Sequence, residues 1–408
     1  MPLPIYKQQE SKKQEERGKS VLKVVAVGVF VVAISLLNIL HTDLSKYIGL
    51  EQTKTAQFRR SLAVNLGGGQ CEWKGPVDAP QDAEIFSTLL AAYPGSGKRA
   101  AFMQLEGMTE LRTGDDYGFT NPDEPDMKYA FMKSSYPHHE GTWSYGSQMS
   151  QTILLVRNPR SALVDYHHMS YELGYPKDWA DTYAHRLNVY TMRPPVADWV
   201  QWRNTRFDLE IKKWGWFIDY WMEGGLLRDV FTNELTTSEH FGHTTQPLTY
   251  GEAELVSEQA SLANVSPEYD EHCVSHMEDC KPVAIASFEK IIEKQTGSHE
   301  IDRFLAVLEG KTGVNIIEKE ARECVWEELI VHGKGTDKTF KNRQGPPDRE
   351  FGFRPQEVKK IQAELQRLRD KYSSGNWAND PIAQSLVGYL DEYIAQNEEE
   401  SRFLTYNS

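Results

Sequence analysis

The chain has 408 residues, of which 25% are charged and 39% hydrophobic, so it is long and apolar enough for a large core in one or two domains. Its formal net charge of −14 argues against a general nucleic-acid-binding protein, and we predict no nucleic-acid partner. The same charge argues against a strongly polyanionic acceptor unless a local basic groove overrides it.

The N-terminal part of the sequence predicts a membrane anchor. The run KVVAVGVFVVAISLLNIL at residues 23–40 is almost unbroken in its apolar character, and with Val21 and Leu22 it reaches about 20 residues, enough to cross a bilayer as a helix. No convincing cleavage site follows, so a retained anchor at 21–41 is favoured over a cleaved signal peptide. A buried core helix is the other alternative. Because basic residues gather in the tail at 1–20, the positive-inside rule predicts a cytosolic tail and a type II orientation.

After a polar stem predicted for 42–80, strand and helix patterns alternate. The strand candidates are STLLAAY (87–93), KYAFMKSSYP (128–137), QTILLVRNP (151–159) and the first half of KPVAIASFEKII (281–292). The helix candidates are residues 99–108, 159–173, 196–232, 298–310 and 355–372. This alternation predicts an α/β fold with a three-layer parallel sheet over 81–372. A C-terminal extension at 373–408 should end in a frayed NEEES tail.

Residues 196–232 contain five tryptophans at helical spacing, and their role is open at this point. An aromatic stripe of this kind is typical of a helix that packs into a core, which is the interpretation we favour. The alternative is a platform on which a sugar ring stacks. The five residues are Trp199, Trp202, Trp214, Trp216 and Trp221.

Four cysteines follow the predicted anchor, and their even number predicts two disulfides in an oxidising compartment. Cys273 and Cys280 lie close together in a polar segment, so we favour that pair among the three possible connectivities. Cys71 is then left to pair with Cys324. The spacing is not that of a zinc site, and we predict no metal.

Two turns at predicted strand ends carry the chemistry. The first, YPGSGKR at residues 93–99, is glycine-rich and opens a helix, an arrangement that suits a phosphate group. It departs from the sequence pattern of the nucleoside-triphosphate P-loop at two positions. Ala92 stands in place of the first glycine, and Arg99 stands in place of the Ser or Thr that binds Mg²⁺. A tight turn without a ligand is the plain alternative. The second turn, RNPR at residues 157–160, follows the most apolar strand candidate. Parallel strands present their ends, and their ligands, at one edge of a sheet.

Taken in this order, the two turns resemble those of membrane-anchored sulfotransferases, and YPGSG is closer to the WSC-domain-containing type than to the cytosolic enzymes. Phe288-Glu289 also resembles the aromatic-acidic motif of that family, and the likeness covers roughly residues 85–345. The resemblance implies the donor 3′-phosphoadenylyl sulfate (PAPS), which needs no metal, and a glycan or glycoprotein hydroxyl as acceptor. It also implies a Golgi membrane protein with a lumenal catalytic domain.

The resemblance assigns roles to individual residues. Arg157 should bind the 3′-phosphate, and Lys98 should steady the leaving oxygen of the donor. Relatives carry a lysine third in the first motif, where this chain has glycine, so Lys98 or Arg99 must substitute for it. The 5′-phosphosulfate should lie in a cradle formed by Gly95, Ser96, Gly97, Lys98 and Arg99.

Two further departures concern the donor site and the base. Asp165 stands where relatives carry a serine that binds the 3′-phosphate, so it should either turn away or weaken donor binding. Cytosolic relatives place a histidine at the second strand end, and this chain has Ser135 there. His138, His139 and Glu140 follow, and we favour His138 as the general base, with exposed loop residues as the alternative. A catalytically inactive binding protein that keeps the fold remains a second interpretation.

Overall fold

The computed structural model describes residues 76–80, 82, 84–115, 129–141, 149–173, 194–244, 249–252, 254–255, 265–274, 280–332 and 349–406. The chain divides into two compact units, Met1–Val64 and Asn65–Ser408, and all of these ranges belong to the second. The predicted tail and anchor, and nearly all of the predicted stem, lie outside the described residues. Within those ranges, no helix has both the length and the apolar character needed to cross a membrane.

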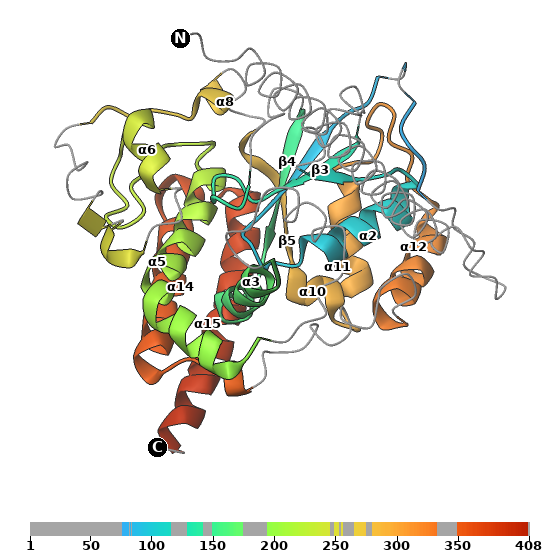
Figure 1. Cartoon of the computed structure of the whole chain (residues 1–408). Coiled ribbons are helices and arrows are strands. Elements are labelled where there is room, and N and C mark those ends of the chain that lie inside the picture. Colours follow the sequence, from blue (N-terminus) through green and yellow to red (C-terminus); the bar gives the residue numbers. More distant parts are fainter. Residues whose placement is uncertain are drawn as a thin grey trace, which may run out of the picture. The chain divides into compact units, whose positions relative to one another are not determined.

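A parallel β-sheet forms the centre of the second unit (Figure 1). Its strands, in the described ranges, follow the order β2-β3-β1-β4-β5, and every neighbouring pair is parallel. The α/β class and the parallel sheet predicted from the alternating pattern are therefore confirmed. The strands are β1 (Thr88–Ala92), β2 (Gly114–Asp115), β3 (Phe131–Ser134), β4 (Gln151–Val156) and β5 (Pro282–Ser287).

The path of the chain through the sheet creates a switch point between β1 and β4. After β1 the chain forms α2 (Lys98–Thr109), continues to β2, and returns to β3 on one side of β1. It then crosses to β4 on the other side and enters α3 (Pro159–Leu173). The turns after β1 and β4 therefore leave the same sheet edge side by side, where ligands bind in open α/β sheets.

Helices lie on both sides of the sheet (Figure 1). On one side α2 packs with α12 (Lys319–Trp326), which in turn packs with α11 (Gly297–Ala306). On the other, α5 packs with both α3 and α14, and α15 packs against α14 and β5. These three helices are α5 (Val196–Met222), α14 (Pro355–Tyr372) and α15 (Pro381–Tyr406). The shorter helices are α6 (Ser238–Thr244), α8 (Glu271–Val274), α10 (Phe288–Ile292), η3 (Glu327–Val331), η4 (Arg349–Phe351) and η5 (Gly375–Trp377).

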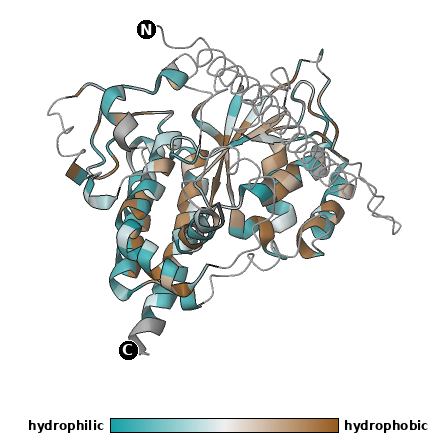
Figure 2. Ribbon diagram, viewed as in Figure 1, coloured by the Kyte–Doolittle hydropathy of each residue, from teal (hydrophilic) through white to brown (hydrophobic). Residues whose placement is uncertain are grey.

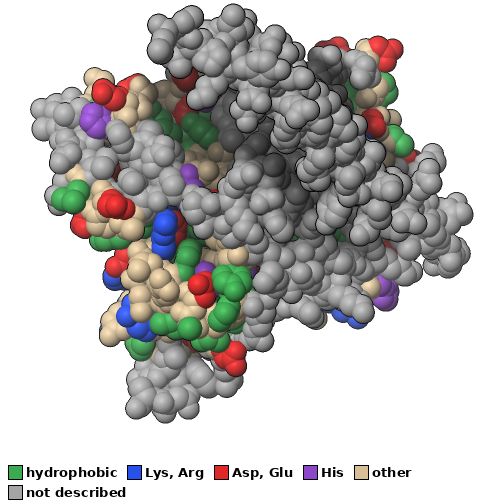
Figure 3. Space-filling view, viewed as in Figure 1, with side chains coloured by type: hydrophobic (Ala, Val, Ile, Leu, Met, Phe, Trp, Pro, Cys, Tyr) green, Lys and Arg blue, Asp and Glu red, His purple; other side chains and the backbone are tan. Residues whose placement is uncertain are grey.

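The core combines the strands with the inner faces of these helices. Figure 2 shows the strands largely in the brown of apolar residues and the outer helices with mixed faces. Four of the five tryptophans of α5 are buried, and Trp202 is partly buried and stacked on Trp199 at 5.6 Å between ring centroids. The core interpretation of the tryptophan stripe is therefore confirmed. On the face seen in Figure 3, charged and hydrophobic side chains of the described residues are interspersed.

The C-terminal segment differs from its prediction. We expected a frayed NEEES tail, and this was wrong, because α15 continues through it to Tyr406. Leu386, Leu390 and Tyr393 are buried at helical spacing, so one stripe of the helix packs into the core while the acidic residues share its outer faces. Residues 373–408, set apart above as an extension, thus contribute a helix to the same core.

Candidate functional site

The turn after β1 requires its two glycines. Gly95 and Gly97 have φ angles of 79° and 82°, in the left-handed region that side chains rarely adopt. A Cβ atom at Gly95 would also overlap the carbonyl oxygen of Ala162 in α3, and one at Gly97 would overlap the ring of Phe288. The lysine that sulfotransferases carry at the position of Gly95 does not fit this turn, which gives a steric reason for that departure.

The turn offers hydrogen-bond donors at the start of α2. Gly97 is the N-cap residue of this helix and has no side chain with which to cap its first turn. Ser96 is buried, and its hydroxyl has no hydrogen-bond partner among the described residues. A helix N-terminus carries partial positive charge, and a buried polar atom without a partner is uncommon in a folded protein. Together they make this turn suited to an anion. Lys98 and Arg99, in the first helical turn, are both half-buried.

Arg157, the first residue after β4, joins the two predicted turns. Its Nη1 donates a hydrogen bond to the carbonyl oxygen of Gly95 at 2.7 Å, and its guanidinium lies 4.4 Å from the centroid of the Phe288 ring. Only 4% of the side chain is exposed. The structure thus brings together the arginine and the glycine turn that the sequence analysis placed at one sheet edge.

Asp165 turns toward Arg157 rather than away from it. Its Oδ2 accepts a second hydrogen bond from Nη1 of Arg157, and 20% of the Asp165 side chain is exposed. The two residues are eight positions apart, and α3 brings the carboxylate back over the end of β4. The positive charge of Arg157 is therefore already balanced by a neighbouring carboxylate.

The Phe288-Glu289 motif supports the same edge from β5. Glu289 Oε1 accepts a hydrogen bond from the backbone N–H of Asn158 at 3.0 Å, and its Oε2 accepts one from the hydroxyl of Tyr393 at 2.9 Å. Phe288 packs against both Gly97 and Arg157. The motif therefore holds the backbone after β4 in place, and its two residues contact both predicted turns.

Lys98 connects the glycine turn to the end of β3. Its Nζ donates a hydrogen bond to Oγ of Ser135, the residue that follows β3. The ammonium group of Lys98 thus lies between the starts of two segments, α2 and the turn at residues 135–141. Any anion at the N-terminus of α2 would lie close to this cation.

His138 is buried, so its alternative interpretation as an exposed loop residue is wrong. Its Nδ1 accepts a hydrogen bond from the backbone N–H of Glu140 at 3.2 Å, which leaves the proton on Nε2. That Nε2 donates to Oε2 of Glu210, also at 3.2 Å. Burial lowers the pKa of His138 to about 4. Both ring nitrogens are thus engaged inside the protein, and in this geometry neither is free to take a proton from a substrate.

Glu210 and Lys213, which the sequence analysis missed, are the charged residues of this buried network. The hydroxyl of Tyr93 donates to Oε2 of Glu210 at 2.6 Å. Burial alone would raise the pKa of Glu210, but Lys213 and the bond from His138 outweigh it and hold that pKa below its usual range. Nζ of Lys213 lies 3.4 Å from Nδ1 of His139. The available signal was a Glu and a Lys, three positions apart, within the tryptophan-rich stripe of α5.

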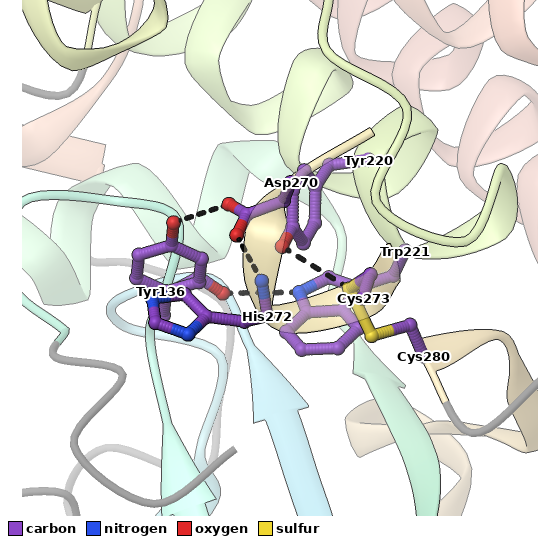
Figure 4. Close-up of a disulfide and its surroundings, with 7 residues drawn as sticks. All are labelled: Tyr136, Tyr220, Trp221, Asp270, His272, Cys273 and Cys280. Carbon is purple, nitrogen blue, oxygen red and sulfur yellow. Dashed lines mark hydrogen bonds between the residues drawn. A yellow bond between two sulfur atoms is a disulfide. The ribbon is translucent and has the colours of Figure 1, made fainter. Parts of the chain in front are cut away.

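The segment that carries the disulfide contacts the turn after β3 through Asp270 (Figure 4). Tyr136 donates from its hydroxyl to Oδ2 of Asp270 at 2.5 Å, and its carbonyl oxygen accepts a bond from Nε1 of Trp221 at 3.0 Å. Oδ1 of Asp270 accepts from the backbone N–H of His272 at 3.0 Å, inside α8. The disulfide Cys273–Cys280 closes this segment.

The favoured Cys273–Cys280 pair is therefore confirmed. Cys324 is also disulfide-bonded, and its predicted partner, Cys71, lies outside the described residues. In the parts of the chain that the structure describes, no group of His, Cys, Asp and Glu side chains is arranged to hold a metal ion.

The site thus consists of a glycine turn, a helix N-terminus, Lys98 and Arg157, whose charge is balanced by Asp165. A buried polar network lies beside it. Comparisons of the chain with protein-family models, with curated proteins and with solved structures found no match in any of the three. The function must therefore be inferred from the residues of this site.

Proposed function

We propose that the protein is a PAPS-dependent sulfotransferase with the sulfotransferase variant of the P-loop-like fold. It transfers the sulfuryl group of PAPS to a hydroxyl of a glycan or glycoprotein acceptor. The observation that carries this proposal is the hydrogen bond from Arg157 to the carbonyl oxygen of Gly95, because it brings both turns of the resemblance together at the switch point of a parallel sheet.

The chemistry of sulfuryl transfer suits the residues at this edge. As the bond between sulfur and the donor's bridging oxygen breaks, negative charge builds on the leaving 5′-phosphate. The N-terminus of α2 and the ammonium of Lys98 stabilise that charge more in the transition state than in the ground state. This step needs no metal ion, which is consistent with Arg99 in place of the Ser or Thr that holds Mg²⁺ in nucleoside-triphosphate P-loops.

The acceptor hydroxyl must lose its proton during transfer, and His138 is the candidate base. In the geometry described above, Nδ1 of His138 is occupied by the N–H of Glu140. His138 takes the proton only after that hydrogen bond opens, so acceptor binding has to rearrange the turn at residues 135–141. Catalytic hydrogen bonds often reach their working geometry only in the substrate complex.

A second candidate function is a catalytically inactive binding protein that keeps this fold. The pairing of Arg157 with Asp165 and the engagement of both ring nitrogens of His138 favour it. Such a protein would present its surface to a lumenal partner and would transfer no sulfate.

Titration of the full chain, purified in detergent, with adenosine 3′,5′-bisphosphate (PAP), the spent donor, tests the proposal. We expect saturable binding with the same affinity in Mg²⁺ and in EDTA, followed by sulfate transfer from labelled PAPS to members of a glycan array. Binding of neither PAP nor ATP would favour the inactive binding protein. Absence of PAP binding together with Mg²⁺-dependent ATP binding would replace both candidates with a kinase-like enzyme.

The proposed location is the Golgi membrane, with a single-pass type II anchor at residues 21–41 and the catalytic domain in the lumen. The apolar run and the basic tail of the sequence support it. Protease added to sealed microsomes should then spare everything after about residue 42. Digestion of the large domain under those conditions would contradict the type II orientation.

A further inference from the structure

The guanidinium of Arg157 has little capacity left for a ligand. Its Nη1 donates to both Gly95 and Asp165. Its Nε is buried without a hydrogen-bond partner among the described residues, and one face of the group is covered by the Phe288 ring. With 4% of the side chain exposed, Nη2 is the nitrogen through which a bound group could still be contacted.

Asp165 determines which kind of ligand group can contact Nη2 of Arg157. Its Oδ2 is used by Arg157, whereas no hydrogen bond within the described ranges reaches its Oδ1, and the side chain is 20% exposed. A phosphate that approached Nη2 would come close to this carboxylate, and the repulsion would offset the attraction of a single guanidinium. A hydroxyl, by contrast, donates a hydrogen bond to a carboxylate oxygen.

We infer that the Arg157–Asp165 pair accepts a ribose hydroxyl in place of a phosphate, so that the nucleotide is held through its 5′ end in the glycine turn. The inference rests on the proposed function, whose donor class it widens. The expected ligands are nucleoside 5′-phosphosulfates with or without a 3′-phosphate. Asp165 is the residue that makes the site bind the two kinds equally well.

The test compares two probes that differ in the 3′-phosphate, PAP and adenosine 5′-monophosphate (AMP), by calorimetric titration of the full chain. For the unaltered protein we expect the two dissociation constants to agree within about threefold. Asp165→Asn removes the negative charge and keeps the shape of the side chain. It should make PAP bind roughly ten- to a hundredfold more tightly than AMP, the range expected for one recovered charge-assisted contact.

A matched control removes one negative charge elsewhere. Asp391 is an exposed residue of α15 that pairs with Arg369, and Asp391→Asn should leave the PAP-to-AMP ratio unchanged. A change of equal size in this control would attribute the effect to net charge and overturn the inference.

Two other results would overturn it as well. One is unaltered protein that binds PAP tenfold or more tightly than AMP, a comparison that requires no variant to fold. The other is a PAP-to-AMP affinity ratio in Asp165→Asn that equals the ratio of the unaltered protein. Asp165→Ser replaces this variant in the measurement if Asp165→Asn does not fold. Failure of every form of the protein to bind either nucleotide is a different outcome, because it removes the phosphate cradle and with it the proposed function.

Discussion

Burial of His138 as a neutral side chain predicts that the protein loses stability in mild acid. The pKa of this histidine falls from 6.5 to about 4 on folding, chiefly because burial disfavours the imidazolium. Lys213 and Lys98 lower it further, while Glu210 acts in the opposite direction. As the pH falls below 6.5, the unfolded chain binds the proton first, so the free energy of unfolding decreases down to about pH 4.

The size of the effect follows from the two pKa values. Between pH 7.5 and pH 5 the linkage amounts to about 2 kcal/mol, and its limit at lower pH is about 3 kcal/mol. His138→Gln keeps a donor for Glu210 but has no titratable group. The unaltered protein should therefore lose about 2 kcal/mol more between pH 7.5 and pH 5 than this variant does, whatever the variant loses at both pH values through altered packing.

Urea unfolding of the full chain at the two pH values measures this difference. His299→Gln is the matched control, since His299 is an exposed residue of α11, and its free energy of unfolding should stay within about 0.5 kcal/mol of the unaltered protein at both pH values. Equal pH dependence in the unaltered protein and in His138→Gln would refute the reasoning, because it would mean that His138 is not buried in its neutral form.

Three further predictions concern the turns after β1 and β3. Lys98→Ala should reduce sulfate transfer more than PAP affinity, because the ammonium serves charge that develops in the transition state; equal losses in the two quantities would contradict this. Gly97→Ala should destabilise the fold by about 2 kcal/mol more than Gly310→Ala in urea unfolding, since both have positive φ but only Gly97 faces a side chain, that of Phe288. Asp270→Asn should cost about 1.5–3 kcal/mol of stability by weakening the bond from Tyr136; a double-mutant cycle with Tyr136→Phe that gives no coupling energy would show that the bond contributes nothing.

The sequence by itself determined most of the local structure. Runs rich in apolar residues predicted the strands β1, β3, β4 and β5. The run of β4 was the clearest, and β4 is buried along its whole length, as expected of a parallel strand covered on both faces. The glycine turn was predicted because left-handed backbone is nearly restricted to glycine. The pair Cys273–Cys280 was predicted because a short separation keeps two thiols close together. Each of these features depends on residues that are near one another in the chain.

The tertiary structure alone decided the chemical state of the candidate site. His138 meets Glu210 across 72 positions of the sequence, and its burial follows from how α5 packs over the turn after β3. Asp165 faces Arg157 because α3 returns along the end of β4, a direction that residue type did not reveal. Burial sets the pKa of His138, and the neighbouring carboxylate of Asp165 sets how far Arg157 can bind an anionic ligand. Both arise when distant segments pack together, so no local pattern in the sequence contains them.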